Sequence, residues 1–176
     1  MKTTLNQFIK RFTVAVLVLA SITVANAQSW DAATCRDLCY IVANQGYYID
    51  DVLVAKCHYT IFNNFNTDEG FVTIYSRNVN YDAYGEPSSL SKSGVSSIIM
   101  ANRRSEGPIT IQITLFNSTN AQKFLNQALE LGFKKVKRTK DSTIYQLSNL
   151  ALEAVDSQRA KQFTFYNFIV QPAYMY

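Results

Sequence analysis

The sequence predicts an α+β fold in which an antiparallel sheet has its helices packed on one face. Three observations predict it. Two amphipathic helical stretches are each followed by strand-like runs, turn-rich segments separate those runs, and the two halves of the chain resemble each other at a constant offset of 86 residues. Helices gathered beside an antiparallel sheet are typical of the α+β class.

The internal repeat aligns residues 30–63 with residues 116–149 without a gap. A short side-chain oxygen can accept a free N–H at the start of a helix, and glycine readily adopts the left-handed conformation that ends one. Matching positions hold an apolar residue, a helix cap and a glycine, in the pairs Trp30 and Phe116, Asp31 and Asn117, and Gly46 and Gly132. We therefore expect two helix-plus-hairpin units. Chance similarity between two helix–strand segments is the alternative.

The first unit, residues 30–79, is expected to contain a helix that ends at Gly46 and a hairpin. Apolar residues recur at helical spacing before this glycine, and the runs 57–65 and 71–79 flank the turn sequence NTDEG. Between the helix and the hairpin, the repeat predicts a strand in YYIDDVLVA, residues 47–55.

The second unit, residues 108–171, is expected to repeat this arrangement. Its helix begins after Asn117 and carries an apolar stripe as far as Gly132. Its two strands are joined by a segment long enough to hold a short helix. The strand-like runs are 142–147 and 163–170 in this unit and, as the arms of another hairpin, 95–101 and 109–116.

The segment 77–94 differs from the rest of the chain because no apolar period crosses it. It is rich in Tyr, Asn, Ser and Gly, the composition of adaptable recognition loops. It is also longer than an ordinary connection, so we expect a functional loop at 80–93 or a partly disordered linker. Anchoring of its aromatic side chains on the protein's own surface is the alternative. The candidate binding residues are Tyr81 and Tyr84 in the loop, with Arg103 and Arg104 of the neighbouring hairpin.

Residues 1–27 have the pattern of a secretory signal peptide. Three basic residues precede the apolar run TVAVLVLASITV, and Ala25 and Ala27 provide the small residues of a cleavage site. The apolar run is too short to cross a bilayer as a helix. A buried N-terminal helix or a membrane anchor is the alternative. We expect a secreted or periplasmic protein whose mature part, residues 28–176, is a single domain.

Removal of this segment leaves 14 basic and 13 acidic residues, so the mature chain is nearly neutral. Nucleic-acid-binding domains usually have a strongly basic balance, so no nucleic-acid partner is expected. No later apolar run is long enough to span a membrane. The one concentrated charge feature is residues 134–140, with five basic side chains. Lysine-rich strands protect sheet edges from aggregation, so we expect an edge strand there; a patch for an anionic glycan is the alternative.

Three cysteines would meet the oxidising compartment to which an exported protein is delivered. Cys35 and Cys39 are four residues apart on the first helix, and Cys57 is expected at the start of the strand beneath it. A disulfide from either helix cysteine to Cys57 would stabilise the fold by about 3 kcal/mol. The leftover thiol would stay free or link two copies as a disulfide-bonded homodimer.

Metal and catalytic sites are not indicated by the sequence. His58 is the only histidine, and with the three cysteines it makes a formal Cys₃His set. Neighbouring strand residues point to opposite faces of a sheet, however, so Cys57 and His58 would not face one ion. The chain also has no glycine-rich phosphate loop. We therefore expect no metal, no cofactor and no catalytic residues.

The sequence favours an exported, non-enzymatic binding or interaction protein with a protein or carbohydrate partner. Two alternatives stay open. One is a small secreted hydrolase or thiol enzyme that uses His58 with a free cysteine. The other is a structural envelope subunit that assembles through the leftover thiol.

Overall fold

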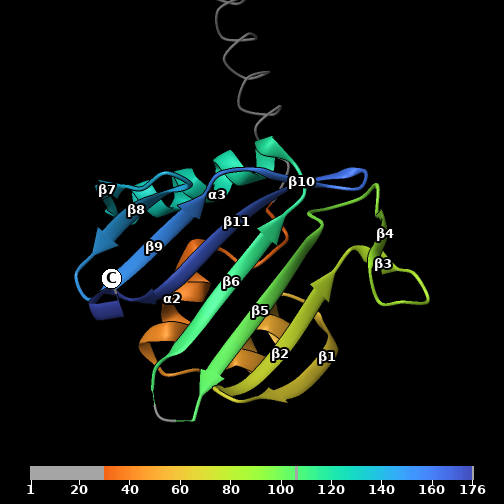
Figure 1. The fold of residues 1–176 in the computed structure, drawn as a ribbon, viewed down its shortest axis with the longest axis horizontal. Helices are drawn as coiled ribbons and strands as arrows, with labels where there is room; N and C mark the ends of the chain where they lie inside the picture. The colour runs from red at the N-terminus through yellow and green to blue at the C-terminus, as the bar shows by residue number, and fades with distance from the viewer. Residues whose placement is uncertain (1–29, 106, 176) are drawn as a thin grey trace, which may run out of the picture. The chain divides into compact units, whose positions relative to one another are not determined.

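The strands of this protein form one large and one small antiparallel sheet (Figure 1). The structure is a computed structural model, which describes residues 30–105 and 107–175. The expected signal peptide, residues 1–27, lies outside the described residues, as does Tyr176. Residues from Asp31 onward belong to a single compact unit.

Within the described residues, the large sheet has nine strands. Eight of them follow the order β1-β2-β5-β6-β11-β9-β8-β7, and β10 pairs with β11 off this path, while β3 and β4 form the small sheet (Figure 1). The strands are β1 (Thr60–Thr67), β2 (Gly70–Arg77), β3 (Val79–Tyr81), β4 (Pro87–Leu90), β5 (Ser97–Arg104), β6 (Ile109–Leu115), β7 (Lys134–Arg138), β8 (Ser142–Leu147), β9 (Leu150–Val155), β10 (Gln158–Ala160) and β11 (Phe163–Pro172).

Helices are few, so the protein is an α+β protein in which the sheet dominates. The helices are α2 (Cys35–Ala43), the π-helix η1 (Asp51–Lys56), α3 (Ser118–Glu130) and the short 3₁₀ helix η2 (Ala173–Met175). Helices α2 and α3 contact each other, and both contact β6. The placement of the helices on one face stays a prediction. No helix in the described part of the chain is long and apolar enough to span a membrane.

The strand order is symmetric about the β6–β11 pair. Helix α2 precedes the four strands on one side of this pair, and α3 precedes the four on the other. The offset of 86 residues brings α2 onto α3, but it brings β1 onto residues 146–153, across the turn between β8 and β9. The strand in the place equivalent to β1 is β7, at the opposite edge. The internal repeat in the sequence therefore also stays a prediction.

The two long helices begin differently from one another. Asn117 caps α3, because its side chain accepts the N–H of Asn120 at 2.8 Å, as the sequence predicts. The N-cap of α2 is Thr34 rather than Asp31. Thr34 and Asp37 form a capping box, in which each side chain accepts the backbone N–H of the other residue. The expected cap Asp31 instead accepts hydrogen bonds from Val95 and Arg77.

The strand predicted in residues 47–55 is wrong, because this segment contains the π-helix η1. Helix α2 ends at Ala43, and Gly46 follows with a φ of 76° and donates its N–H to Ile41 O at 2.8 Å. This glycine is required, since an added Cβ would lie 2.7 Å from the Ile109 side chain. The chain then continues into η1, where Leu53 is fully buried. Burial of that side chain against the core overrides the strand propensity of the tyrosine- and valine-rich run.

Two predicted hairpins are confirmed, and the longest predicted connection is not. Strands β1 and β2 pair across a tight turn, as do β5 and β6 across a longer one. The segment 148–162, expected to connect two strands with a short helix, instead supplies β9 and β10. Strand β9 lies between β8 and β11 and buries Ala151 and Leu152, so it is a central strand of the sheet.

The core lies along the middle strands of the sheet. Alternate residues of β6, from Ile109 to Leu115, are buried, and the residues between them are half-buried. The same alternation occurs in β5, where Ser97 is fully buried and shares a hydrogen bond of 2.6 Å with the hydroxyl of Tyr59. Burial raises the pKa of Tyr59 to about 12, so this hydroxyl stays protonated and can serve as donor or acceptor.

Candidate interaction surface

The four predicted binding residues do not come together. Tyr81 and Tyr84 belong to the β3–β4 hairpin, which follows directly from the Arg77 end of β2. Arg103 and Arg104 lie at the far end of β5, where Arg104 pairs with Gly70 at the start of β2. An eight-residue strand separates the two ends by about 23 Å at the usual rise per residue. The expected joint site is therefore two separate places.

Segment 77–94 is neither an irregular loop nor a linker, because it folds into the β3–β4 hairpin (Figure 1). The Asp82 carboxylate accepts the N–H groups of Tyr84 and Glu86, at 2.9 Å each, and so shapes the turn. Short polar side chains commonly stabilise turns in this way. These two strands give little signal in the sequence, because they are only three and four residues long and mostly polar.

The two tyrosines of the hairpin have different roles. The Tyr81 ring stacks on Phe62 of β1, with ring centroids 3.8 Å apart, and its hydroxyl donates to Ser76 Oγ at 2.8 Å. Tyr81 is therefore an anchor for the hairpin. Tyr84 is 92% exposed and can reach a ligand. On the other side of the hairpin, Glu86 pairs with Lys161 and the Ser88 carbonyl accepts from Gln162 at 2.8 Å.

The two arginines also differ. Arg103 donates a hydrogen bond of 2.6 Å to the carbonyl of Gly46, so it ties the end of β5 to the segment after α2. Arg104 is exposed at the same end of the strand. Arg104 pairs with Gly70 of β2 through its backbone, and its side chain is exposed and far from Tyr84.

A second exposed apolar feature lies on the neighbouring strand β1. We define the β1 edge surface as this strand, which exposes the side chains of Ile61, Phe62 and Phe65 by 50%, 38% and 42%, respectively. All eight residues of β1 are exposed, and the strand lies at one end of the strand order, so it pairs on one side only. Strand edges of this kind are places where another strand can add.

This surface carries no charge of its own. The sequence TIFNNFNT of β1 has no acidic or basic residue, and the nearest carboxylates along the chain are those of the turn residues Asp68 and Glu69. Three features of the sequence could have indicated the β1 edge surface. They are an uncharged strand, a tight turn after it, and aromatic residues in the strand that follow no amphipathic pattern.

The three cysteines do not form the expected disulfide. All three lie in the described part of the chain, and no two of them are at bonding distance. Cys35 and Cys39 face each other on α2, and Cys57 follows the π-helix instead of starting a strand beneath α2. Contact with the Cys39 thiol and burial raise the pKa of Cys35, and burial with the nearby Asp37 raises the pKa of Cys57. Both buried thiols are therefore poor nucleophiles at neutral pH.

The argument against a Cys–His metal set assumed that Cys57 and His58 are neighbours in a strand, which is wrong because both precede β1. The described residues contain no group of three or more metal-ligating side chains. His58 lies in the turn between η1 and β1, is exposed, and has a φ of 56°. Adjacent Cys57 is buried. The two side chains thus occupy different environments, with one in solvent and the other in the interior.

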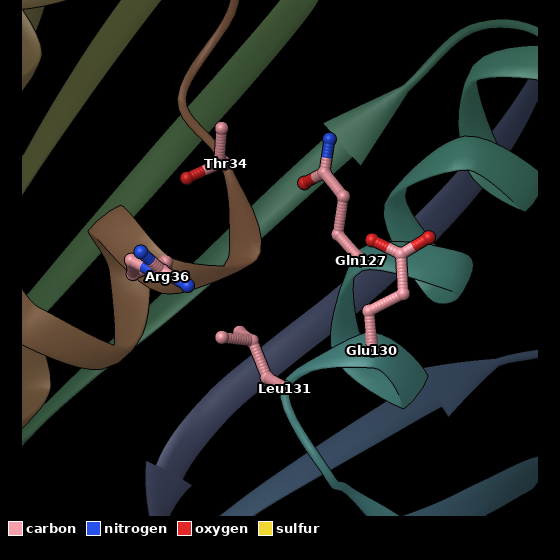
Figure 2. Close-up of a pocket in the computed structure, with 5 residues that line it drawn as sticks. All are labelled: Thr34, Arg36, Gln127, Glu130 and Leu131. Carbon is pink, nitrogen blue, oxygen red and sulfur yellow. The ribbon is translucent and has the colours of Figure 1, made fainter.

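A pocket of about 300 Å³ lies between the start of α2 and the end of α3 (Figure 2). Gln127 in its wall accepts the N–H of Cys35 at 3.0 Å and so helps to cap α2. The basic and acidic residues of the wall are exposed. The lining residues are Thr34, Arg36, Gln127, Glu130 and Leu131. The pocket lies between two helices, and these five lining residues include no cysteine and no histidine.

Comparison of the chain with models of protein families, with curated proteins and with solved structures found no significant match. The function must therefore be argued from the geometry.

Proposed function

We propose that this protein is an exported, non-enzymatic interaction protein that binds an extended segment of a protein partner along β1. The observation that carries the proposal is the β1 edge surface, an eight-residue strand that is exposed throughout, uncharged and paired on one side only. A strand that adds to such an edge gains main-chain hydrogen bonds along its length and apolar contacts from alternate side chains.

The direction of the main-chain groups supports the proposal. Thr67 and Gly70 face each other across a two-residue turn, and hydrogen-bonded positions alternate along an antiparallel pair. The N–H and C=O groups of Asn64 and Asn66 therefore point away from β2. The Asn64 N–H is bonded at 2.8 Å to the Asn63 side chain, as expected for a donor outside the ladder. An incoming strand would replace this local bond.

Carbohydrate is the weaker of the two partner classes. A sugar would stack on an exposed ring such as Tyr84, but the neighbouring ring of Tyr81 is already stacked on Phe62. A single free ring gives less binding energy than a complete strand edge. The thiols of Cys35 and Cys57 also weaken the thiol-enzyme alternative, since contact with Cys39 raises the pKa of Cys35 and burial raises that of Cys57.

Export is supported by the sequence of residues 1–27, with its basic start, apolar run and small residues, and by the nearly neutral charge of the remainder. Intact-mass measurement of the protein recovered from its native compartment tests this part. A chain that begins near Gln28 supports export, and one that retains residues 1–27 contradicts it.

We further infer that the domain consists of two units, each a helix followed by four strands along the main path of the large sheet, with both helices on one face of the sheet. The symmetric strand order and the shared contacts of α2 and α3 with β6 support this arrangement. In an experimental structure, the halves 35–115 and 118–172 should superpose by a two-fold rotation about an axis between β6 and β11. Helices found on opposite faces would contradict it.

The strand-addition proposal is tested with a synthetic peptide of the β1 sequence, residues 60–67, flanked by lysines for solubility. We expect this peptide to slow amide hydrogen exchange at Asn64 and Asn66 of the protein, because their outward N–H groups become hydrogen-bonded. The amides of Lys135 and Lys137 on the opposite edge serve as an internal control and should not change.

A second peptide with proline in place of the central asparagine provides the matched control, since it lacks a main-chain donor. Equal protection by both peptides, or protection only on β7, would show that β1 is not a strand-addition site.

A further inference from the structure

The partner that fits β1 best is a second copy of β1. We propose that two copies of this protein associate through their β1 strands, antiparallel about a two-fold axis, to form one continuous sheet. This inference rests on the proposed function, because it names the occupant of the same edge. It differs from a disulfide-linked dimer, since none of the three cysteines lies on β1.

Charge is the first reason to choose a second copy. A two-fold axis brings identical segments together, so any charged residue near it meets its own sign. Like charges directly opposite each other destabilise strand pairs. Strand β1 has no charged side chain and can pair with itself without this penalty. Strand β7 could not, because it would place Lys134, Lys135, Lys137 and Arg138 against the same residues of the other copy.

The direction of the main chain limits the register. Only positions whose main-chain groups point outward can hydrogen-bond to each other. On β1 these are Asn64 and Asn66, so the simplest symmetric register places Asn64 opposite Asn64 of the second copy. Each Asn64 N–H then donates to the carbonyl of its counterpart. The Asn63 side chain, which now accepts this N–H, turns away into solvent.

This register also buries apolar area. With Asn64 on the axis, Phe65 lies opposite Asn63 of the second copy and diagonally across from its Phe65. Diagonal neighbours in a sheet are about 7–8 Å apart, within reach of aromatic side chains. Phe65 is 42% exposed in the single chain and lies opposite the buried Val72. The two rings would extend the apolar surface that Val72 begins.

The bulge at Phe62 limits the length of the pairing. The register of β1 on β2 shifts between Ile61 and Asn63, so regular alternation holds only from Asn63 to Thr67. Phe62 itself is occupied by its stacking on Tyr81. A short strand pair buries less than the roughly 1,200 Å² of a standard stable interface. We therefore expect a dimer that dissociates on dilution.

The first test compares Asn64→Pro with Asn64→Thr by sedimentation velocity over a concentration series of the mature chain. Proline removes the outward N–H, which β2 does not use, and proline is tolerated on edge strands at such positions. We expect it to weaken dimerisation at least about tenfold, because both copies lose a hydrogen bond. Threonine keeps the N–H and should leave the dimer intact. Equal dimerisation of the two variants would overturn the proposal.

The second test determines the register. Under mild oxidation, Asn64→Cys should form a disulfide between copies, because the Cα atoms of a hydrogen-bonded antiparallel pair lie about 5.5 Å apart, within the range that a disulfide spans. Asn66→Cys should not, since each residue lies four positions from its counterpart. The unsubstituted chain controls for its native thiols. Faster cross-linking at residue 66 than at residue 64 would exclude this register.

These results separate the dimer from the proposed function. If the protein is monomeric at every concentration and the β1 peptide still protects Asn64 and Asn66, the edge accepts strands but not its own copy, and only the dimer proposal is wrong. If neither the peptide nor a second copy protects these amides, both proposals are wrong.

Discussion

The two edges of the sheet are opposites. Strand β1 has eight exposed residues, none of them charged, and presents Ile61, Phe62 and Phe65. Strand β7 has five residues, of which four are basic, and it also is exposed throughout. Both strands contain a bulge, between Ile61 and Asn63 in β1 and between Lys135 and Lys137 in β7.

This difference shows how one sheet can have one edge that discourages pairing with other strands and another that permits it. Unpaired strand edges invite other strands, and short length, lysines and bulges all discourage pairing. Strand β7 has all three of these features, whereas β1 has only the bulge. The asymmetry between two edges of the same sheet therefore supports the proposal that β1 binds another strand.

The largest effect on stability is expected from substituting the tyrosines on the strands next to the two edge strands. Tyr75 of β2 pairs with Ile61, is 2% exposed, and donates to Asp50 at 2.7 Å. Tyr145 of β8 pairs with Lys135 and is only half-buried. Tyr75→Ala should lower the free energy of unfolding by about 3–5 kcal/mol, as for other buried aromatic side chains. Tyr145→Ala should lower it by less.

Urea denaturation of both variants measures this difference. An equal or larger loss for Tyr145→Ala would mean that the β7 edge, and not the β1 edge, rests on the better-packed strand.

An intermediate effect on stability is expected from two ion pairs, one between α2 and η1 and the other at β7. Burial would raise the pKa of Asp37, but hydrogen bonds from Lys56 and Thr34 outweigh it and hold that pKa below its usual range. A lowered pKa in the folded state stabilises the protein above the ordinary carboxyl pKa, near 4, and this stability is lost as pH falls through the lowered value. Asp37→Asn should cost about 1 kcal/mol at neutral pH, because asparagine can still accept the Thr34 N–H but loses the charged hydrogen bond with Lys56.

The β7 side supplies the matched control, Asp156→Asn. A hydrogen bond from Arg138 lowers the pKa of Asp156, but this ion pair lies at the surface with side chains 45% and 51% exposed, so the effect on stability should be small. Thermal melts between pH 2 and pH 7 should therefore show a shallower acid loss for Asp37→Asn than for Asp156→Asn. The reverse order would contradict the assignment.

The smallest effect on stability is expected from neutralising the β7 edge with Lys135→Asn and Lys137→Asn together. Both side chains are exposed, so the free energy of unfolding should change by no more than about 0.5 kcal/mol for each substitution. Self-association should nevertheless increase, because the like-charge barrier at this edge is weakened. Light scattering at equal concentrations of the variant and the unsubstituted chain checks this, and unchanged scattering would show that the lysines do not protect the edge.

Much of the fold could be predicted from the sequence where local signals and burial agree. Asn117 caps α3, NTDEG forms the turn between β1 and β2, and the basic stretch 134–140 lies at a sheet edge, as expected. The predictions failed where a residue that suits a local role is bound instead by residues far away in the sequence. Asp31 is a suitable helix cap, but Arg77 at the end of β2 and the backbone of Val95, just before β5, donate hydrogen bonds to it and leave the cap to Thr34.

The candidate site could be predicted only in part. Tyr84 is exposed as expected, but Tyr81 faces inward because Phe62 and Ser76 lie beside it in the folded chain. Arg103 and Arg104 are near Tyr84 in sequence and far from it in space, since an antiparallel strand carries them to the other end of the sheet. Sequence distance is a poor guide to neighbours across a β ladder.

The sequence by itself determined the α+β composition, the helix ends at Asn117 and near Gly46, and the neutral and basic character of the strands that became β1 and β7. Only the tertiary structure decided that these two strands lie at opposite edges and that β9 enters between β8 and β11. The physical reason is that capping and turn preferences act between residues a few positions apart. Strand order is set by which apolar faces the whole chain can bury together, and no short segment contains that information.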